Sequence, residues 1–259
     1  MVNCQVYGKT GELVVVYSAD RLSSNSSNEE RKEQNGQFTE FFESRTGQVV
    51  VVAIIAVFFL LALIPSKEQK KAHQRGADVK ALTISALMVA AAIVLGQFKL
   101  FEMPQGGAVT PLSNLPIVLC AYYLGTRRGV TAGMCVGLLN LIFGPYVIHP
   151  LQMLLDYPLA FGALGLGGVM RNKKNGIVKG YILGLAGRYV VAVVSGIVFF
   201  GAYAPAGFNA FTWSVWYNFT YLAAEGVITV IIISIPTVKK TLEKLRFQID
   251  PGFIPIHRG

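Results

Sequence analysis

The sequence predicts an all-α polytopic membrane protein, in which a core of six helices is preceded by one extra N-terminal transmembrane helix. Hydrophobic residues make up 53% of the 259 residues and charged residues only 14%, whereas soluble domains are about 25% charged. The apolar residues form long runs, and the lysines and arginines lie in short clusters between these runs. A lipid bilayer is the solvent that suits this arrangement.

The N-terminal part is expected to contain a polar tail, one span and a basic linker. Residues 1–47 are polar, and we expect an extracytoplasmic tail without a fold of its own. Residues 48–65 lack any charged side chain and have the length of one membrane-spanning helix. Residues 66–80 are rich in Lys and Arg and form the expected cytoplasmic linker.

Further apolar segments within residues 81–238 form the predicted membrane domain. They are Ala81–Phe98, Pro111–Leu124, Val130–Phe143, His149–Met170, Gly180–Ala202 and Phe211–Pro236. Segments of about 14 residues are short for a hydrocarbon core about 30 Å thick. We therefore expect protein-shielded helix ends, or broken helices, around Gly106–Pro116, because irregular backbone is tolerated in a membrane only beside protein or a cavity.

The charges predict the orientation of the chain in the cell membrane. Basic clusters occur in every second loop, at Lys67–Lys80, Arg127–Arg128, Arg171–Lys179 and Lys239–Arg246. Cytoplasmic loops are enriched in Lys and Arg, so we expect the N-terminus outside and residues 239–259 in the cytoplasm. The loops that contain MPQGG, GPYVIHP and YAPAG then lie on the outer face, and their Gly, Pro and aromatic content suits the mouth of a binding site.

One predicted helix carries a polar stripe inside the membrane. His149, Gln152 and Asp156 are three and four residues apart and share a helix face, with Tyr157 next to Asp156. An ionisable group at such a position is a candidate for ligand contact, although a structural partner could also hold the carboxylate. His149 stands at the outer helix end, where it is either a ligand residue or a capping residue.

Counting residues inward from the outer loops places several candidates at one depth. Asp156, Gly196 with Ser195, and Asn218 each lie six or seven residues from the outer end of their helix, or about 10 Å. Near this level lie the aromatic residues Phe200, Tyr203, Trp213, Trp216 and Tyr217. They could enclose a flat heterocycle or a cation, or form the interfacial belt of a membrane protein.

Two further features suggest contacts within the membrane. Arg188 and Glu225 lie at similar depth, and we expect them to pair with each other. Ala81 with Ser85, and Ala86 with Ala90, have the spacing of small residues that lets another helix approach closely. That helix belongs either to a partner subunit or to the same chain.

The sequence lacks the common signatures of catalysis and of nucleic-acid binding. It contains no GxxxxGK[ST], HExxH or GxSxG motif and no cluster with metal-ligand spacing, so we expect no catalytic residue, metal site or cofactor. The basic residues do not gather on one face, which argues against nucleic acid as a partner. Active transport would need energy from another subunit or from an ion gradient.

Several long motifs together resemble the thiamine-specific S components of energy-coupling factor (ECF) transporters. These motifs are MPQGG (103–107), RRG (127–129), HPLQMLLDYPLAFGALGLGG (149–168) and SGIVFFGAYAPAG (195–207). The resemblance implies a six-helix, non-enzymatic subunit that binds thiamine at the outer face. It also implies a membrane coupling subunit and two cytoplasmic ATPase subunits as partners.

The resemblance also implies ligand positions. The family's acidic and aromatic pair falls on Asp156 and Tyr157, and its glycine and asparagine fall on Gly196 and Asn218. Two aromatic positions correspond to Phe200 and Trp213, and His149 and Tyr203 complete our candidate site. The family's histidine four residues before the glycine is Ala192 here.

Three hypotheses remain at this point. The first is a high-affinity thiamine-binding S component of an ATP-driven importer. The second, suggested by Ala192, is an S component for a thiamine precursor or a related heterocycle. The third is a stand-alone secondary transporter of a small organic cation, which inverted repeats would support, and the sequence shows no convincing repeat.

Overall fold

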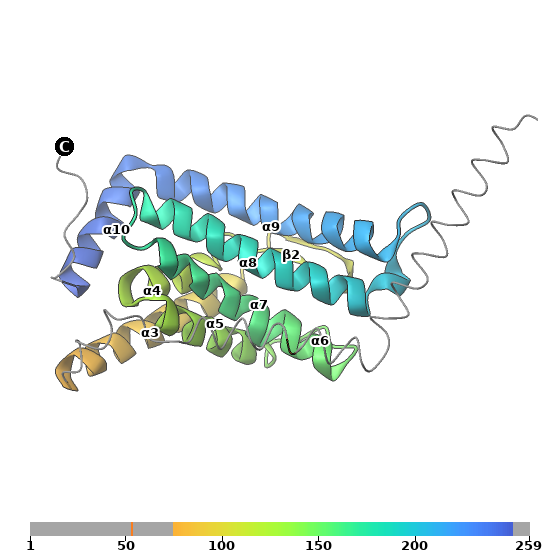
Figure 1. The fold of residues 1–259 in the computed structure, drawn as a ribbon, viewed down its shortest axis with the longest axis horizontal. Coiled ribbons are helices and arrows are strands. Elements are labelled where there is room, and N and C mark those ends of the chain that lie inside the picture. The colour runs from red at the N-terminus through yellow and green to blue at the C-terminus, as the bar shows by residue number, and fades with distance from the viewer. Residues whose placement is uncertain (1–52, 54–74, 251–259) are drawn as a thin grey trace, which may run out of the picture.

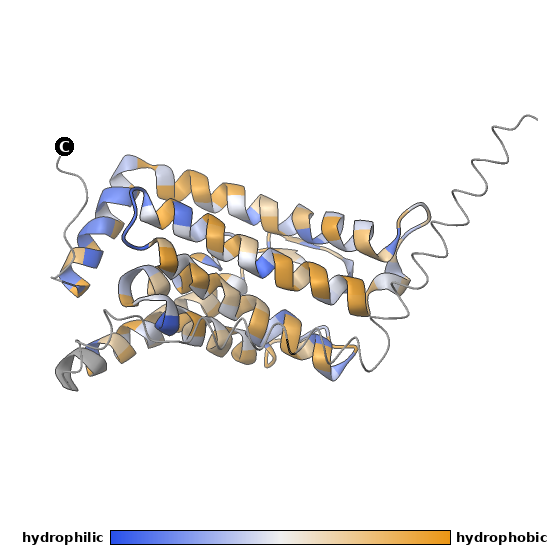
Figure 2. Cartoon of the chain, viewed as in Figure 1, coloured by the Kyte–Doolittle hydropathy of each residue, from blue (hydrophilic) through white to orange (hydrophobic). Residues whose placement is uncertain are grey.

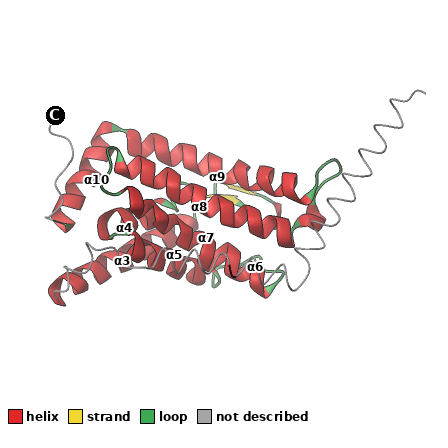
Figure 3. Ribbon diagram, viewed as in Figure 1, coloured by secondary structure: helices red, strands yellow, loops and turns green. Residues whose placement is uncertain are grey.

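The computed structural model describes residue 53, which is helical, and residues 75–250, which form a helical bundle with one small strand ribbon (Figure 1). The predicted tail, the extra span apart from residue 53, and most of the basic linker lie outside these residues. The described helices, connected mostly by short loops (Figure 3), are α3 (Arg75–Gly96), α4 (Leu115–Leu124), α5 (Thr126–Asn140), α6 (Pro150–Leu154), α7 (Ala160–Ala163), α8 (Gly176–Phe199), α9 (Ala210–Ser234) and α10 (Pro236–Ile249).

Four helical segments are long and apolar enough to cross a membrane. They are Val79–Gly96, Pro150–Met170, Gly176–Phe199 and Ala210–Ser234. Large apolar side chains such as Leu82 and Ile231, which are 71% and 61% exposed, point away from the bundle. A bilayer provides the apolar surroundings that such a surface needs. The predicted all-α membrane protein is confirmed.

The segment that connects α3 to α5 consists of a strand ribbon followed by a short helix. Residues 97–114 contain β1 (Phe101–Glu102) and β2 (Ala108–Val109), which pair antiparallel with Phe101 opposite Val109. The ribbon lies beside α9, and the short helix α4 follows it with residues 116–124 all buried. The expected irregular backbone and protein-shielded short helix are therefore present, but the sequence did not indicate the ribbon.

Glu225 explains how α4 can begin inside the bundle. Its Oε1 accepts hydrogen bonds from the Asn114 backbone N–H at 3.1 Å and from Ser113 Oγ at 3.0 Å. A carboxylate at a helix N-terminus satisfies unpaired N–H groups and interacts favourably with the helix dipole. Arg188 donates to Asn114 Oδ1 and lies 4.0 Å from the centre of the Phe161 ring.

The expected direct pairing of Arg188 with Glu225 is therefore wrong. Among the described residues, the ion pairs within 4.0 Å join Lys99 to Glu102 and Arg171 to Asp250. Asn114 connects the two charges instead, with its side chain bonded to Arg188 and its backbone bonded to Glu225. Depth along two helices predicted the proximity but not this intervening residue.

The crossing predicted as one helix from His149 to Met170 changes its winding along its length. Between α6 and α7 lies a π-helical turn, Leu155–Leu159, which contains Pro158, and a 3-10 turn follows over Leu164–Met170. Proline lacks a backbone N–H and therefore cannot complete the ordinary helical ladder.

Helix α5 packs against this irregular crossing almost backbone to backbone. A Cβ atom on Gly133 would lie 2.2 Å from the Phe161 carbonyl oxygen, and one on Gly137 would lie 2.3 Å from that of Tyr157. Only glycine leaves room for such an approach. The two glycines therefore fix the position of the π-helical turn.

The two small-residue spacings of α3 have different surroundings. Ala81 is buried in the core, and Ser85 accepts a weak hydrogen bond from Cys120 Sγ at 3.6 Å, so this pair packs within the chain. Ala86 and Ala90 are exposed on the bundle surface. Of the two spacings, the one formed by Ala86 and Ala90 lies on the surface, where another helix could pack against it.

One end of the bundle is closed by α10 and is rich in hydrophilic residues (Figure 2), among which are the basic clusters Arg171–Lys179 and Lys239–Arg246. The fully buried Arg246 donates to the Arg171 carbonyl and to Asn172 Oδ1, and its guanidinium lies 4.4 Å from the centre of the Tyr122 ring. Arg171 pairs with Asp250 at 2.7 Å. These contacts bind α10 across the ends of the membrane-spanning helices.

Candidate functional site

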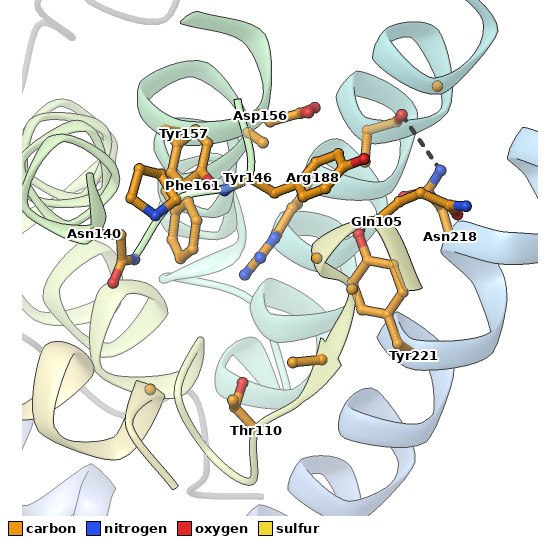
Figure 4. Close-up of a pocket in the computed structure, with 18 of the residues that line it drawn as sticks. Gln105, Thr110, Asn140, Tyr146, Asp156, Tyr157, Phe161, Arg188, Asn218 and Tyr221 are labelled. Atoms are coloured by element: carbon orange, nitrogen blue, oxygen red, sulfur yellow. Dashed lines mark hydrogen bonds between the residues drawn. The ribbon is translucent and has the colours of Figure 1, made fainter. Parts of the chain in front are cut away.

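A cavity of about 220 Å³ lies between the strand ribbon, the π-helical turn, α8 and α9 (Figure 4). Sites for drug-sized ligands typically measure about 300 to 1,000 Å³, so this cavity suits a smaller metabolite. Two of the three loops predicted at the outer face contribute to its lining, through Gln105–Gly107 and Phe143–Tyr146. The main side chains from the other elements are Asp156, Tyr157, Phe161, Arg188, Ala192, Gly196, Phe200, Trp213, Tyr217, Asn218 and Tyr221.

The π-helical turn supplies the carboxylate and the phenol. Asp156 is half-buried, and its Oδ2 accepts a hydrogen bond of 2.6 Å from Gln152 Nε2. The Tyr157 hydroxyl accepts the backbone N–H of Tyr146 at 2.8 Å. A π-turn widens the helix and redirects its side chains, and such turns frequently occur at functional sites. Here it allows two consecutive residues to line one cavity.

Helices α8 and α9 meet at Gly196 and form the opposite wall. A Cβ atom on Gly196 would lie 2.1 Å from Ser214 Oγ, so glycine is needed for the close approach of α9. The buried Asn218 donates from Nδ2 to the Ser214 carbonyl at 2.9 Å and accepts from Tyr221 Oη at 2.9 Å. The asparagine amide is therefore held in one orientation at the cavity wall.

Aromatic rings cover the side of the cavity that lies away from α10. Trp213 and Tyr217 on α9 have ring centroids 5.7 Å apart, and Tyr146 stacks on Phe200 with centroids 6.0 Å apart. Tyr217 also accepts the Gly107 N–H at 2.9 Å and donates to the Pro104 carbonyl, so it fixes the ribbon turn. Trp216 is 59% exposed and lies on the outside of the bundle, where it fits the interfacial belt.

Two of the predicted site residues do not line the cavity. His149 Nδ1 accepts the Leu151 N–H at 3.1 Å and caps α6, and its ring stacks on Phe199 at 5.1 Å. Tyr203 is 44% exposed and lies with its ring 6.0 Å from that of Phe200. The capping role that the sequence left open for His149 is the one that its geometry shows.

Sequence analysis missed several residues of the cavity wall. Arg188 brings a guanidinium to the same cavity as the Asp156 carboxylate, and Phe161, Tyr146 and Tyr221 complete the ring of side chains (Figure 4). The sequence favours pairing of Arg188 with Glu225 over ligand contact, because counting depth says nothing about the direction in which a side chain points. Ala192 also lines the cavity, so the departure from the family pattern faces the site itself.

The lining groups of this site suit the binding of a small polar ligand. Within residues 75–250, no three His, Cys, Asp or Glu side chains come together as a metal site. The cavity is lined by one carboxylate, one guanidinium, one lysine ammonium, several side-chain amides and hydroxyls, and several aromatic rings. Such a set recognises a planar polar ligand through hydrogen bonds and stacking.

Comparison with known proteins relates this architecture to a family. Residues 82–245 match the thiamine transporter protein family (Thia_YuaJ). Thiamine transporter ThiT of Bacillus subtilis is 36% identical over 166 residues, which is 57% of this chain and 85% of the relative. Thiamine transporter ThiT of Lacticaseibacillus paracasei is 31% identical over 138 residues, or 47% of this chain and 69% of the relative.

A solved structure shares both the fold and part of the sequence. ThiT from Listeria monocytogenes superposes with a TM-score of 0.54 and 27% identity, over 65% of this chain and 98% of the other. The matched family region spans α4 to α9 in full and most of α3 and α10. With its helical membrane fold and its cavity between α8, α9 and the ribbon, this chain belongs to the thiamine transporter protein family.

Proposed function

We propose that this protein takes part in thiamine uptake as the high-affinity, substrate-binding S component of an ECF-type, ATP-driven importer. The observation that carries the proposal is the cavity, which places Asp156 among aromatic rings in a member of the thiamine transporter family. The protein itself is a binding and transport subunit and not an enzyme.

The lining groups match the chemistry of thiamine. The Asp156 carboxylate can accept hydrogen bonds from an aminopyrimidine or balance the charge of a thiazolium ring. Trp213, Tyr217 and Phe200 offer faces on which the rings can stack, and a thiazolium gains from cation–π attraction. Asn218, held by Ser214 and Tyr221, presents a fixed amide to a ring edge.

The polarity of the bundle supports capture at the outer face of the cell membrane. The basic clusters Arg171–Lys179 and Lys239–Arg246 lie at the hydrophilic α10 end of the bundle (Figure 2), which we assign to the cytoplasm. The cavity is lined by the MPQGG and GPYVIHP loops, which lie on the other side of the predicted topology. The N-terminus then lies outside and the C-terminus inside.

The partners in this proposal are a membrane coupling subunit and two cytoplasmic ATPases. The sequence contains no GxxxxGK[ST] motif, so energy from ATP must come from another chain. The exposed Ala86 and Ala90 on α3 provide a face of small residues at which a helix of the coupling subunit can pack closely.

Isothermal titration of the purified protein in detergent with thiamine tests the substrate and the site together. We expect tight binding, and we expect Asp156→Asn to weaken it at least about tenfold, because a charge-assisted contact contributes about 1.5 to 3 kcal/mol. Glu243→Gln on α10 is the matched control, since it removes a carboxylate far from the cavity. Equal affinities for the wild type and Asp156→Asn would exclude Asp156 from the site.

A further titration and a transport assay distinguish the alternatives. A hydroxymethylpyrimidine that binds as tightly as thiamine would identify a precursor as the substrate. Thiamine accumulation in proteoliposomes that contain this chain alone would show a stand-alone transporter and contradict the S-component proposal. The proposal expects accumulation only when the coupling subunit, the ATPases and ATP are also present.

A further inference from the structure

Gln152 lines the cavity and connects the cavity carboxylate to loop residues 142–148 through two donor bonds and one acceptor bond. Its Nε2 donates to Asp156 Oδ2 at 2.6 Å and to the Tyr146 carbonyl at 3.1 Å. Its Oε1 accepts the backbone N–H of Ile148 at 3.1 Å. These partners fix the amide orientation, because only the nitrogen can donate and only the oxygen can accept.

The loop on the other side of these bonds carries a cavity-lining aromatic. Tyr146 lines the cavity and stacks on Phe200, and both of its backbone polar groups are held by the segment that supplies Asp156. Its N–H donates to Tyr157 Oη at 2.8 Å, and its carbonyl accepts from Gln152. The ligand-facing pair Asp156–Tyr157 and the loop are therefore joined by hydrogen bonds at Tyr146 and Ile148.

Gln152 is a buried polar residue whose amide makes its hydrogen bonds within the bundle. Gln152 is only 1% exposed, and a leucine or methionine of similar size would fill the same space without any cost of dehydrating an amide. The amide is stable at this position because all three contacts are made. Loss of any one of them leaves a buried polar group without a partner.

We infer that Gln152 is a positioning residue that couples occupation of the cavity to the ordering of loop residues 142–148. A ligand held by Asp156 fixes the carboxylate, the fixed carboxylate fixes Gln152, and Gln152 holds the backbone of Tyr146 and Ile148. Coupling is reciprocal, so an ordered loop also slows ligand release. This inference rests on the proposed function for the identity of the ligand, but not for the loop contacts themselves.

Hydrogen–deuterium exchange of the loop, with thiamine as the probe, tests the coupling. In the wild type, saturating thiamine should slow exchange in peptides that cover 142–148. In Gln152→Leu these peptides should exchange faster than in the wild type without ligand, and thiamine should not slow their exchange. Thiamine should also dissociate from this variant about tenfold to a hundredfold faster than from the wild type. Gln248→Leu, at an exposed position on α10, is the matched control.

The pH dependence of thiamine affinity in Gln152→Glu tests the inference further. If Gln152 had only a structural role, this substitution would not change that pH dependence. Glutamate keeps the size, but at neutral pH it places a second carboxylate against Asp156 and removes the donor. As the pH falls, one proton held between the two carboxyl groups restores a donor, so thiamine affinity of this variant should rise from pH 8 toward pH 6. The wild type should show no such rise.

The outcomes separate this inference from the proposed function. Wild-type protein that fails to bind thiamine contradicts the proposed function, whereas the exchange of ligand-free Gln152→Leu still tests the loop contacts. Unchanged exchange in that variant, or a wild-type pH profile in Gln152→Glu, overturns the inference. If Gln152→Leu does not fold, the pH profile of the isosteric glutamate variant decides.

Discussion

The two ends of the bundle differ in structure: one end is closed by α10, and the other end contains the cavity. At the α10 end, the helices end in a filled network in which Arg246 donates to the Arg171 carbonyl and Arg171 pairs with Asp250. At the cavity end, the chain uses a strand ribbon, a π-helical turn and loops, and leaves a space of about 220 Å³. The strand ribbon and the π-helical turn accompany the binding site, and the filled hydrogen-bond network accompanies the closed end.

The buried polar groups have different partners at the two ends of the bundle. At the closed end, a buried guanidinium stabilises the attachment of α10, and desolvation by burial lowers the pKa of Arg246 below its ordinary value. At the cavity end, Asp156, Asn218 and Tyr157 are each held by a neighbouring residue while they line the cavity. The first set joins elements of the chain, and the second set is positioned for a ligand.

The largest effect is expected at the closed end. Arg246→Met should lower the free energy of unfolding by about 3 kcal/mol, because the Arg171 carbonyl and Asn172 lose a charged donor. Thermal unfolding in detergent measures this loss, with Lys244→Met on the exposed part of α10 as the control. Thiamine affinity of the folded fraction should stay unchanged, and a parallel loss of affinity would show that the two ends are not independent.

An intermediate effect is expected where the close packing of α5 supports the cavity. Gly137→Ala places a Cβ 2.3 Å from the Tyr157 carbonyl oxygen, so the π-helical turn must move. Overpacking of this kind costs about 1 to 3 kcal/mol, and we expect thiamine affinity to fall together with stability. Gly187→Ala is the matched control, since its nearest neighbour, Leu166 Cδ1 at 3.1 Å, belongs to a flexible side chain. Lost stability with unchanged affinity would separate α5 from the site.

The smallest effect is expected from a change inside the cavity itself. Ala192→His restores the family's imidazole at a lining position, and one added hydrogen bond should tighten thiamine binding about tenfold without changing thermal stability. Isothermal titration with thiamine and with a hydroxymethylpyrimidine measures the change for both ligands. Weaker thiamine binding in this variant would instead show a cavity adapted to its alanine.

The sequence predicted the helices closely because apolar runs and charged ends are local properties. The segments expected from Pro111, Gly180 and Phe211 begin in the structure at Leu115, Gly176 and Ala210. Counting residues inward from the outer loops also placed Asp156, Gly196 and Asn218 at one depth, and all three line one cavity. Their roles in binding thiamine remain predictions.

By itself the sequence determined the membrane class and the apolar helical segments, because hydrophobicity is a property of the chain alone. The orientation of these segments in the membrane stays a prediction. Only the tertiary structure decided which side chains face the cavity and which partners they meet. Arg188 against Asn114, Glu225 at the start of α4, and Gln152 between Asp156 and Tyr146 are examples. The rotation of each helix about its axis, and the π-helical turn at Pro158, depend on packing between segments far apart in the chain.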